Sequence, residues 1–190
     1  MKFLIIDNGT IRMKELKKML SGNIYELMEF DKIDLKKAEE FDIIILTGGS
    51  KFPVLGNEDL YKREISLIKN SSRPIIGICL GFELIAHAFG AKLTKIDEKV
   101  HGIIKIDIYN NSKLFFNISN LNVYESHKWV IKKLPEYFVT LAKSEYGIEA
   151  FRDKNRRLYG FQFHLSVFPE KTCGYEVFNN LLVDIKNTSS

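Results

Sequence analysis

Hydrophobic positions in the first half of the chain fall into short continuous runs separated by segments with a helical spacing. Residues 3–7, 42–46 and 75–78 are apolar runs typical of buried strands, and a further strand is expected over 25–30. Apolar residues share one face over 11–20, and a second helix is predicted over 58–69. Strands that alternate with helices predict an α/β fold, with a mostly parallel open sheet flanked by helices on both faces.

The pattern changes after residue 92. Residues 92–163 contain short runs in which apolar and polar positions alternate, most clearly over 103–109 and 147–151. We expect these runs to form an antiparallel β extension, followed by a last sheet strand that leads to His164. A closing helix is predicted to begin at Glu170 or Gly174 and to end at Ile185, and the polar tail at 187–190 is expected to fray.

Composition narrows the class of protein. A chain of 190 residues, 45% of them hydrophobic, is long enough for one core, so we expect a single domain over residues 1–190. No apolar stretch reaches the roughly 20 residues of a membrane span, and the start lacks an export signal, so a cytoplasmic protein without a membrane partner is expected. The net charge of +4 is too mild to indicate nucleic acid binding. Only two cysteines occur, and pairing them would remove the free thiol at Cys79, so a reducing compartment is expected. Neither has a Cys or His partner at ligand spacing, so no metal site is expected.

The clearest chemical signal is a Gly-x-Cys-x-Gly turn at Gly77, Cys79 and Gly81, between an apolar strand and a helical pattern. This is the pattern of a nucleophile elbow, in which small neighbours tolerate a strained turn and leave space around the nucleophile. The positive end of the following helix would favour a thiolate. Cys79 is therefore the candidate nucleophile, whereas Cys173 is expected to be an ordinary thiol near a helix.

A cysteine nucleophile needs a base, and His164 is the best placed of the four histidines. It follows the alternating run 158–163, so its side chain is expected at a strand end, where α/β sheets build their sites. Cys79 and His164 could therefore meet at one edge of the sheet.

These two segments, Gly77 to Gly81 and Gly160 to His164, resemble the class I (triad-type) glutamine amidotransferase domain, and the similarity extends over most of the chain. The resemblance implies a flavodoxin-like sheet, attack of Cys79 on the side-chain amide of glutamine, and proton transfer by His164. It also implies an oxyanion hole formed by the main-chain N–H groups of Leu80 and of the loop at Gly48 and Gly49. Such a reaction needs no cofactor.

The chain departs from the family pattern at two places. The family reads His-Pro-Glu, whereas here Ser166 stands at the position of the glutamate that orients the histidine. Glu170, in a later Pro-Glu pair, is the first candidate to replace it; the alternatives are a weaker role for Ser166 or an incomplete triad. The second departure is Glu83, where the family has a glutamine that touches the substrate; a carboxylate there would change the hydrogen bonding and raise the pKa of Cys79.

Short motifs bear on the subtype. Ser126 and His127 lie in a segment that resembles the glutaminase component of GMP synthetase, and both are expected at the substrate. His101 lies in a segment similar to the glutaminases of anthranilate and aminodeoxychorismate synthases. The resemblance implies a partner, a separate ATP-dependent synthetase that receives ammonia, with GMP synthetase the first hypothesis. The alternatives are a stand-alone hydrolase of γ-glutamyl amides and, because of Ser166, a non-catalytic subunit that only binds a partner.

Overall fold

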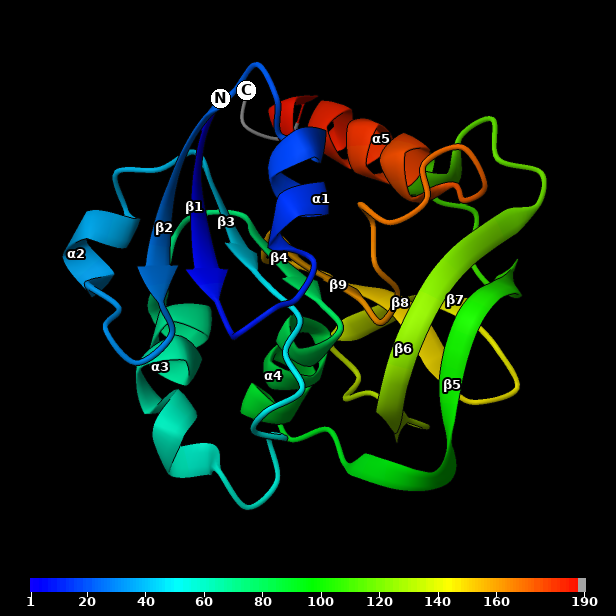
Figure 1. Ribbon diagram of the computed structural model, residues 1–190, viewed down its shortest axis with the longest axis horizontal. Coiled ribbons are helices and arrows are strands. Elements are labelled where there is room, and N and C mark those ends of the chain that lie inside the picture. Colours follow the sequence, from blue (N-terminus) through cyan, green and yellow to red (C-terminus); the bar gives the residue numbers. More distant parts are fainter. Residues whose placement is uncertain (188–190) are drawn as a thin grey trace.

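A computed structural model describes residues 1–187, whose strands form a nine-stranded sheet in the order β2-β1-β3-β4-β9-β8-β7-β5-β6 (Figure 1). The strands are β1 (Lys2–Asp7), β2 (Ile24–Glu29), β3 (Ile43–Leu46), β4 (Ile75–Ile78), β5 (Leu93–Ile108), β6 (Leu121–Ile131), β7 (Phe138–Lys143), β8 (Ile148–Asp153) and β9 (Leu158–Phe161). The helices are α1 (Met13–Met19), α2 (Leu35–Ala38), α3 (Lys62–Asn70), α4 (Leu80–Ala88) and α5 (Gly174–Asn187), with 3₁₀ turns η1 (Glu58–Tyr61) and η2 (Lys113–Phe115).

The sheet has a parallel and an antiparallel half. Strands β2, β1, β3, β4 and β9 are mutually parallel, and β8, β7, β5 and β6 continue the sheet in antiparallel pairs. The predicted α/β sheet with an antiparallel extension is confirmed. The parallel pairing of β4 with β9 matters most for function, because it brings the end of the Cys79 strand beside the strand that leads to His164.

Alternating side chains of the parallel strands pack into two separate hydrophobic cores, one on each face of the sheet. Phe3 and Ile5 pack on one face with apolar residues of α1 and α5. Leu4 and Ile6 pack on the opposite face with α2, α3 and α4. Figure 1 shows α1 and α5 above the strands and α3 and α4 below them. Helices therefore cover both faces of the sheet, as the sequence predicts for a parallel α/β architecture.

Two element boundaries differ from the predictions. The first helix begins at Met13, and Ile11, expected on its buried face, is 85% exposed. The preceding loop is held instead by the Asp7 carboxylate, which accepts from the N–H groups of Gly9 and Thr10, and by the Thr10 hydroxyl, which accepts from the N–H of Arg12. These side-chain bonds replace the first helical turn.

In the antiparallel half, β5 is one strand of 16 residues where shorter runs were expected. Its pairing with β6 shifts register between Lys95 and Val100, which interrupts the alternation that marks a strand in the sequence. The closing helix begins at Gly174, the second of the two predicted starts, so Glu170 lies in the loop before it.

None of the helices within residues 1–187 has the length and apolar character needed to cross a bilayer. The predicted fraying beyond residue 187 lies outside the described residues.

Candidate active site

Cys79 occupies a strained turn between β4 and α4. Its φ of 52° and ψ of −101° are unusual for a residue with a side chain. The turn is fixed on both sides, because the N–H of Cys79 donates to the Phe161 carbonyl at 2.8 Å and its carbonyl accepts from the N–H of Glu83 at 3.0 Å. Strain that the surrounding structure maintains in this way is typical of functional turns, as in a nucleophile elbow.

The two elbow glycines are required by backbone packing. A Cβ at Gly77 would lie 2.5 Å from the Gly81 carbonyl oxygen, and a Cβ at Gly81 would lie 2.4 Å from the Leu46 carbonyl oxygen. The sequence suggests that these glycines leave space around the sulfur. The structure shows that they let α4 approach β3 and β4 closely.

His164 lies three residues beyond β9, and its main-chain N–H donates to the Tyr124 carbonyl at 2.9 Å. Gly48 lies close to both His164 and the cysteine. A Cβ added to Gly48 would lie 3.2 Å from Cε1 of His164 and 3.4 Å from Cβ of Cys79. The structure therefore brings Cys79 and His164 together beside Gly48, as expected from strands that end at one sheet edge.

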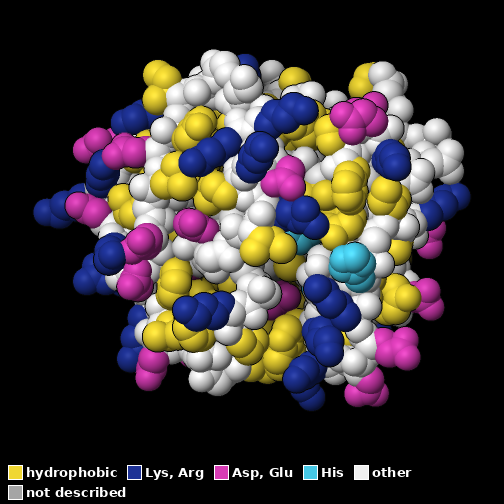
Figure 2. Space-filling view, in the orientation of Figure 1, with side chains coloured by type: hydrophobic (Ala, Val, Ile, Leu, Met, Phe, Trp, Pro, Cys, Tyr) yellow, Lys and Arg dark blue, Asp and Glu magenta, His cyan; other side chains and the backbone are white. Residues whose placement is uncertain are grey.

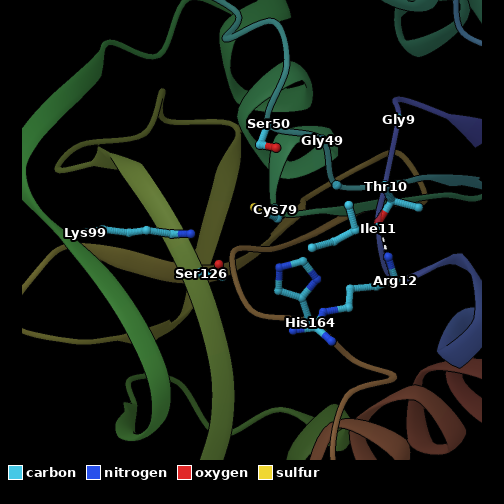
Figure 3. A pocket seen from close by; sticks show the side chains of 11 residues that line it. Gly9, Thr10, Ile11, Arg12, Gly49, Ser50, Cys79, Lys99, Ser126 and His164 are labelled. Atoms are coloured by element: carbon cyan, nitrogen blue, oxygen red, sulfur yellow. Dashed lines mark hydrogen bonds between the residues drawn. The ribbon is translucent and has the colours of Figure 1, made fainter.

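Two adjoining cavities meet at Cys79. The smaller, of about 80 Å³, contains Cys79 and His164, with Lys99 and Arg12 reaching it from opposite sides (Figure 3). The larger, of about 310 Å³, extends from Cys79 past Glu83. The expected binding residues line one or both: Gly48 the smaller, Leu80, Glu83 and His127 the larger, and Gly49 and Ser126 both.

One main-chain donor lies beside the sulfur, and a glycine of the neighbouring loop lines the same cavities. Leu80 is the first residue of α4, and its N–H lowers the pKa of Cys79 through a hydrogen bond. Gly49 cannot carry a side chain, because a Cβ there would lie 2.2 Å from the Asn8 carbonyl oxygen. Leu80 and Gly49 therefore both lie at the cavities around Cys79, and their role as oxyanion donors stays a prediction.

The environment keeps the candidate nucleophile and the candidate base neutral. Burial raises the pKa of the Cys79 thiol well above its usual range, and the Glu83 carboxyl raises it further. Burial, followed by the charge of Arg12, lowers the pKa of His164 to about 4. The helix dipole predicts a thiolate at Cys79, but desolvation outweighs it here, so the resting pair is a thiol and a neutral imidazole.

Ser166 and Glu170 line a third cavity of about 190 Å³ together with Glu15 and Lys18. Ser166 is buried and Glu170 is exposed. No hydrogen bond within the described residues joins either side chain to the His164 ring, and neither lines the two cavities at Cys79. The structure thus leaves the predicted third position of the triad without an acidic partner for His164.

His127 belongs to a buried cluster behind the larger cavity. Its Nδ1 donates to the Trp129 carbonyl at 2.9 Å, and its Nε2 lies 2.8 Å from a Glu125 carboxylate oxygen. The ligand atoms of Glu125, His127 and Glu149 lie within 4.8 Å of one another, so these residue types could hold a metal ion. Burial raises the pKa of Glu125 to about 7 and that of Glu149 to about 8. These carboxyls can therefore hold protons near neutral pH, and hydrogen bonds through those protons account for the close contacts among Glu125, His127 and Glu149.

Arg12 and Tyr124 lie at this site although no sequence pattern indicates it. Arg12 donates to the Tyr124 hydroxyl at 3.0 Å, and the Tyr124 ring contacts the His164 ring. Arg12 falls in a segment predicted as helix, and Tyr124 lies in an ordinary strand pattern, so only the tertiary structure reveals their proximity to His164.

A buried cysteine on a strained strand-to-helix turn, opposite a histidine at the edge of an α/β sheet, is typical of enzymes that use a cysteine nucleophile. The family model for class I glutamine amidotransferases matches residues 4–184, so the chain belongs to that family of enzymes. The glutamine-hydrolyzing GMP synthase subunit of Archaeoglobus fulgidus is 33% identical over 150 residues, which cover 78% of each chain. The corresponding subunit of Methanosphaera stadtmanae is 37% identical over 139 residues, covering 72% of this chain and 71% of its relative.

Solved structures show the same fold. The crystal structure of a Thermoplasma acidophilum protein described as a GMP synthase subunit superposes with a TM-score of 0.88 at 27% identity, covering 100% of this chain and 96% of that one. A glutamine amidotransferase from Thermotoga maritima superposes with a TM-score of 0.75 at 20% identity, covering 98% and 83%.

Proposed function

We propose that this enzyme hydrolyses the side-chain amide of glutamine through a thioester on Cys79 and supplies the ammonia to a separate synthetase subunit. The observation that carries the proposal is the placement of Cys79 and His164 beside Gly48 in one cavity, with a larger cavity adjoining at Cys79. Membership of the class I glutamine amidotransferases supports it.

The reaction begins from a neutral pair. His164 has a lowered pKa, so its imidazole is unprotonated at neutral pH and accepts the Cys79 proton as the sulfur attacks the amide carbon. The tetrahedral oxyanion accepts hydrogen bonds from the N–H groups of Leu80 and Gly49. His164 then returns the proton to the amide nitrogen, the C–N bond breaks and ammonia leaves. Water, deprotonated by His164, attacks the γ-glutamyl thioester, which releases glutamate and restores the Cys79 thiol.

The larger cavity offers positive charge for the carboxylate of an amino acid and a neutral carboxyl for a side-chain amide. Lys95, Lys99 and Lys128 line it and would attract the α-carboxylate. Burial raises the pKa of Glu83 to about 8, so at neutral pH its carboxyl is largely protonated and both donates and accepts hydrogen bonds. A protonated Glu83 therefore offers the two hydrogen-bonding capacities of the glutamine that the family has at this position.

The ammonia needs an acceptor, and we propose the ATP-dependent subunit of GMP synthetase as the partner. The relatives named as glutamine-hydrolyzing subunits of GMP synthase support this choice. Figure 2 shows a run of Lys and Arg side chains over the β5–β6 pair, the region that supplies Lys95, Lys99 and Lys128 to the cavity wall. An acidic face of a synthetase would complement this surface.

The glutaminase step is tested by peptide mapping after exposure to a diazoketone analogue of glutamine. Cys79 should be labelled selectively and protected by glutamine, and Cys173 is the internal control because it is the second free thiol of the chain. Equal labelling of both cysteines, or labelling that glutamine does not suppress, would contradict the proposal. The Cys79→Ser variant should lose the label and ammonia release together.

The partner is tested by adding the ATP-dependent GMP synthetase subunit. Glutamine should then support GMP formation, and Cys79→Ser should abolish it while free ammonia still supports it. If only free ammonia supports GMP formation with the wild-type chain, the proposed partner is wrong.

A second candidate function is hydrolysis of another γ-glutamyl amide without a partner, which Glu83 favours because an acidic group replaces the family's amide in the cavity. Turnover of a γ-glutamyl amide by the chain alone, at a higher kcat/KM than glutamine, would select this function.

A further inference from the structure

His164 lacks the acidic neighbour that completes a triad, yet its ring is firmly placed. Its main-chain N–H donates to the Tyr124 carbonyl at 2.9 Å, and its ring centroid lies 5.9 Å from the Tyr124 ring centroid with the planes inclined by 55°. One residue therefore contacts both the backbone and the side chain of the candidate base.

Tyr124 is itself held from several directions. Its hydroxyl accepts a hydrogen bond from Nη2 of Arg12 at 3.0 Å and lies 3.2 Å from Nε2 of His101. Because arginine only donates, the hydroxyl proton is free to go to His101. The Arg12 guanidinium also lies 5.3 Å from the Tyr124 ring centroid, and the Phe168 ring meets Tyr124 edge-on at 5.2 Å. Tyr124 is buried, so these contacts fix its ring in one orientation.

We infer that Tyr124, anchored by Arg12, is the positioning residue for His164 and takes the orienting role that a carboxylate has in a complete triad. The kinetic part of this inference rests on the proposed glutaminase function, whereas the placement of His164 can be tested without any substrate.

The anchor differs from a carboxylate in its charge. Burial is the largest cause of the lowered pKa of His164; the charges of Arg12, His127 and Lys99 lower it further, and Glu15 raises it. Glu15 is paired with Arg12 at 3.2 Å. Tyr124 and Arg12 thus orient the imidazole without stabilising the imidazolium, so the base stays unprotonated into mildly acidic solution. Ammonia release should accordingly persist at pH 5, where a histidine paired with a carboxylate would be protonated.

Three variants separate orientation from charge. Tyr124→Phe keeps the ring and releases Arg12, Arg12→Lys keeps the charge and loses the fork geometry, and Arg12→Gln loses both. Tyr175→Phe is the matched control. Tyr175 lines the cavity that Ser166 and Glu170 share, and its hydroxyl has no hydrogen-bond partner within the described residues.

In steady-state assays of glutamine hydrolysis, Tyr124→Phe and Arg12→Lys should each lower kcat by about tenfold, with KM within about twofold, because a misplaced base affects the transition state more than binding. In NMR titrations of the histidine ring, Arg12→Gln should raise the pKa of His164 by about one unit, and Arg12→Lys should leave it near the wild-type value. Tyr124→Phe should broaden or shift the His164 ring signals, and Tyr175→Phe should leave kcat and the ring signals unchanged.

Values of kcat within twofold of wild type for both Tyr124→Phe and Arg12→Lys would overturn the inference. If the wild-type chain releases no ammonia under any condition, the proposed function fails and the titration decides the inference alone: unchanged His164 signals in Tyr124→Phe would then overturn it.

Discussion

At the scale of single residues, burial and one neighbouring acid determine the pKa of the Cys79 thiol. Cys79 is buried, and Glu83 follows it by one turn of α4. The Glu83 carboxyl is the second cause, after burial, of the raised pKa of Cys79. Since the pKa of Glu83 is about 8, its carboxyl is already ionised at the higher pH that the thiol needs to ionise. The two groups therefore oppose each other's ionisation.

This coupling predicts the behaviour of Glu83→Gln. An amide removes the charge, so the pKa of Cys79 should fall, and alkylation of Cys79 by iodoacetamide at pH 8.5 should become about threefold faster, equivalent to about half a pKa unit. The rate is measured by mass spectrometry against pH, with Cys173 as the control whose rate should not change. Identical pH profiles for Cys79 in the wild type and the variant would show that Glu83 exerts no charge effect on the sulfur.

At the scale of the elements, the elbow depends on close approach between α4 and the parallel strands. Gly81→Ala should cost about 3 kcal/mol or more of unfolding free energy, because its Cβ would meet the Leu46 carbonyl oxygen at 2.4 Å, a backbone atom that cannot move aside. Gly56→Ala is the control: Gly56 has a φ of +84° but open space around it, so only backbone strain of about 1 kcal/mol is expected. Urea unfolding measures both, and similar losses for the two variants would refute the packing argument.

Elements that depend on local sequence patterns are predictable, and contacts between distant residues are not. Strands β1, β3 and β4 and the elbow are encoded in continuous apolar runs and local glycines, so the sequence predicts them and the edge where Cys79 and His164 meet. The bond between Arg12 and Tyr124 joins residues 112 positions apart and leaves no local pattern. The expected burial of Ile11 is wrong because side-chain bonds from Asp7 and Thr10 override its helical spacing. The position of Glu170 depends on where α5 begins, and helix starts are poorly fixed by sequence.

At the scale of the whole molecule, the interior holds more acid than a packed core usually tolerates. Glu64, Glu83, Glu125 and Glu149 are all buried. Burial raises the pKa of Glu64, Glu83 and Glu149 to about 8 and that of Glu125 to about 7. Oε1 of Glu64 accepts a hydrogen bond from the Asn8 side chain at 3.0 Å. Its other oxygen, Oε2, has no hydrogen-bond partner within the described residues. Glu64, Glu83 and Glu149 are therefore largely neutral carboxyls in the folded chain at pH 7.

The sign of the resulting pH dependence follows from proton binding. Between the unfolded carboxyl pKa of 4.5 and the folded values near 8, the folded chain binds more protons than the unfolded chain, so the free energy of unfolding falls as pH rises. His164 acts in the opposite direction, but only between its folded pKa of about 4 and its ordinary value of 6.5. Stability should therefore decrease steadily from pH 6.5 to pH 8.5, with each acid of folded pKa near 8 contributing at most about 2 kcal/mol.

Glu64→Gln isolates one of these contributions, because the amide oxygen can still accept from Asn8 and Glu64 lies apart from the two cavities at Cys79. The variant should show a smaller loss of Tm between pH 6.5 and pH 8.5 than the wild type, and Glu98→Gln, at an exposed position, should show the same loss as the wild type. Differential scanning calorimetry at half-unit intervals of pH measures the slopes. A wild-type Tm that stays level or rises over this interval would mean that the buried acids are already ionised in the folded chain, and it would contradict the neutral Glu83 on which the proposed glutamine recognition rests.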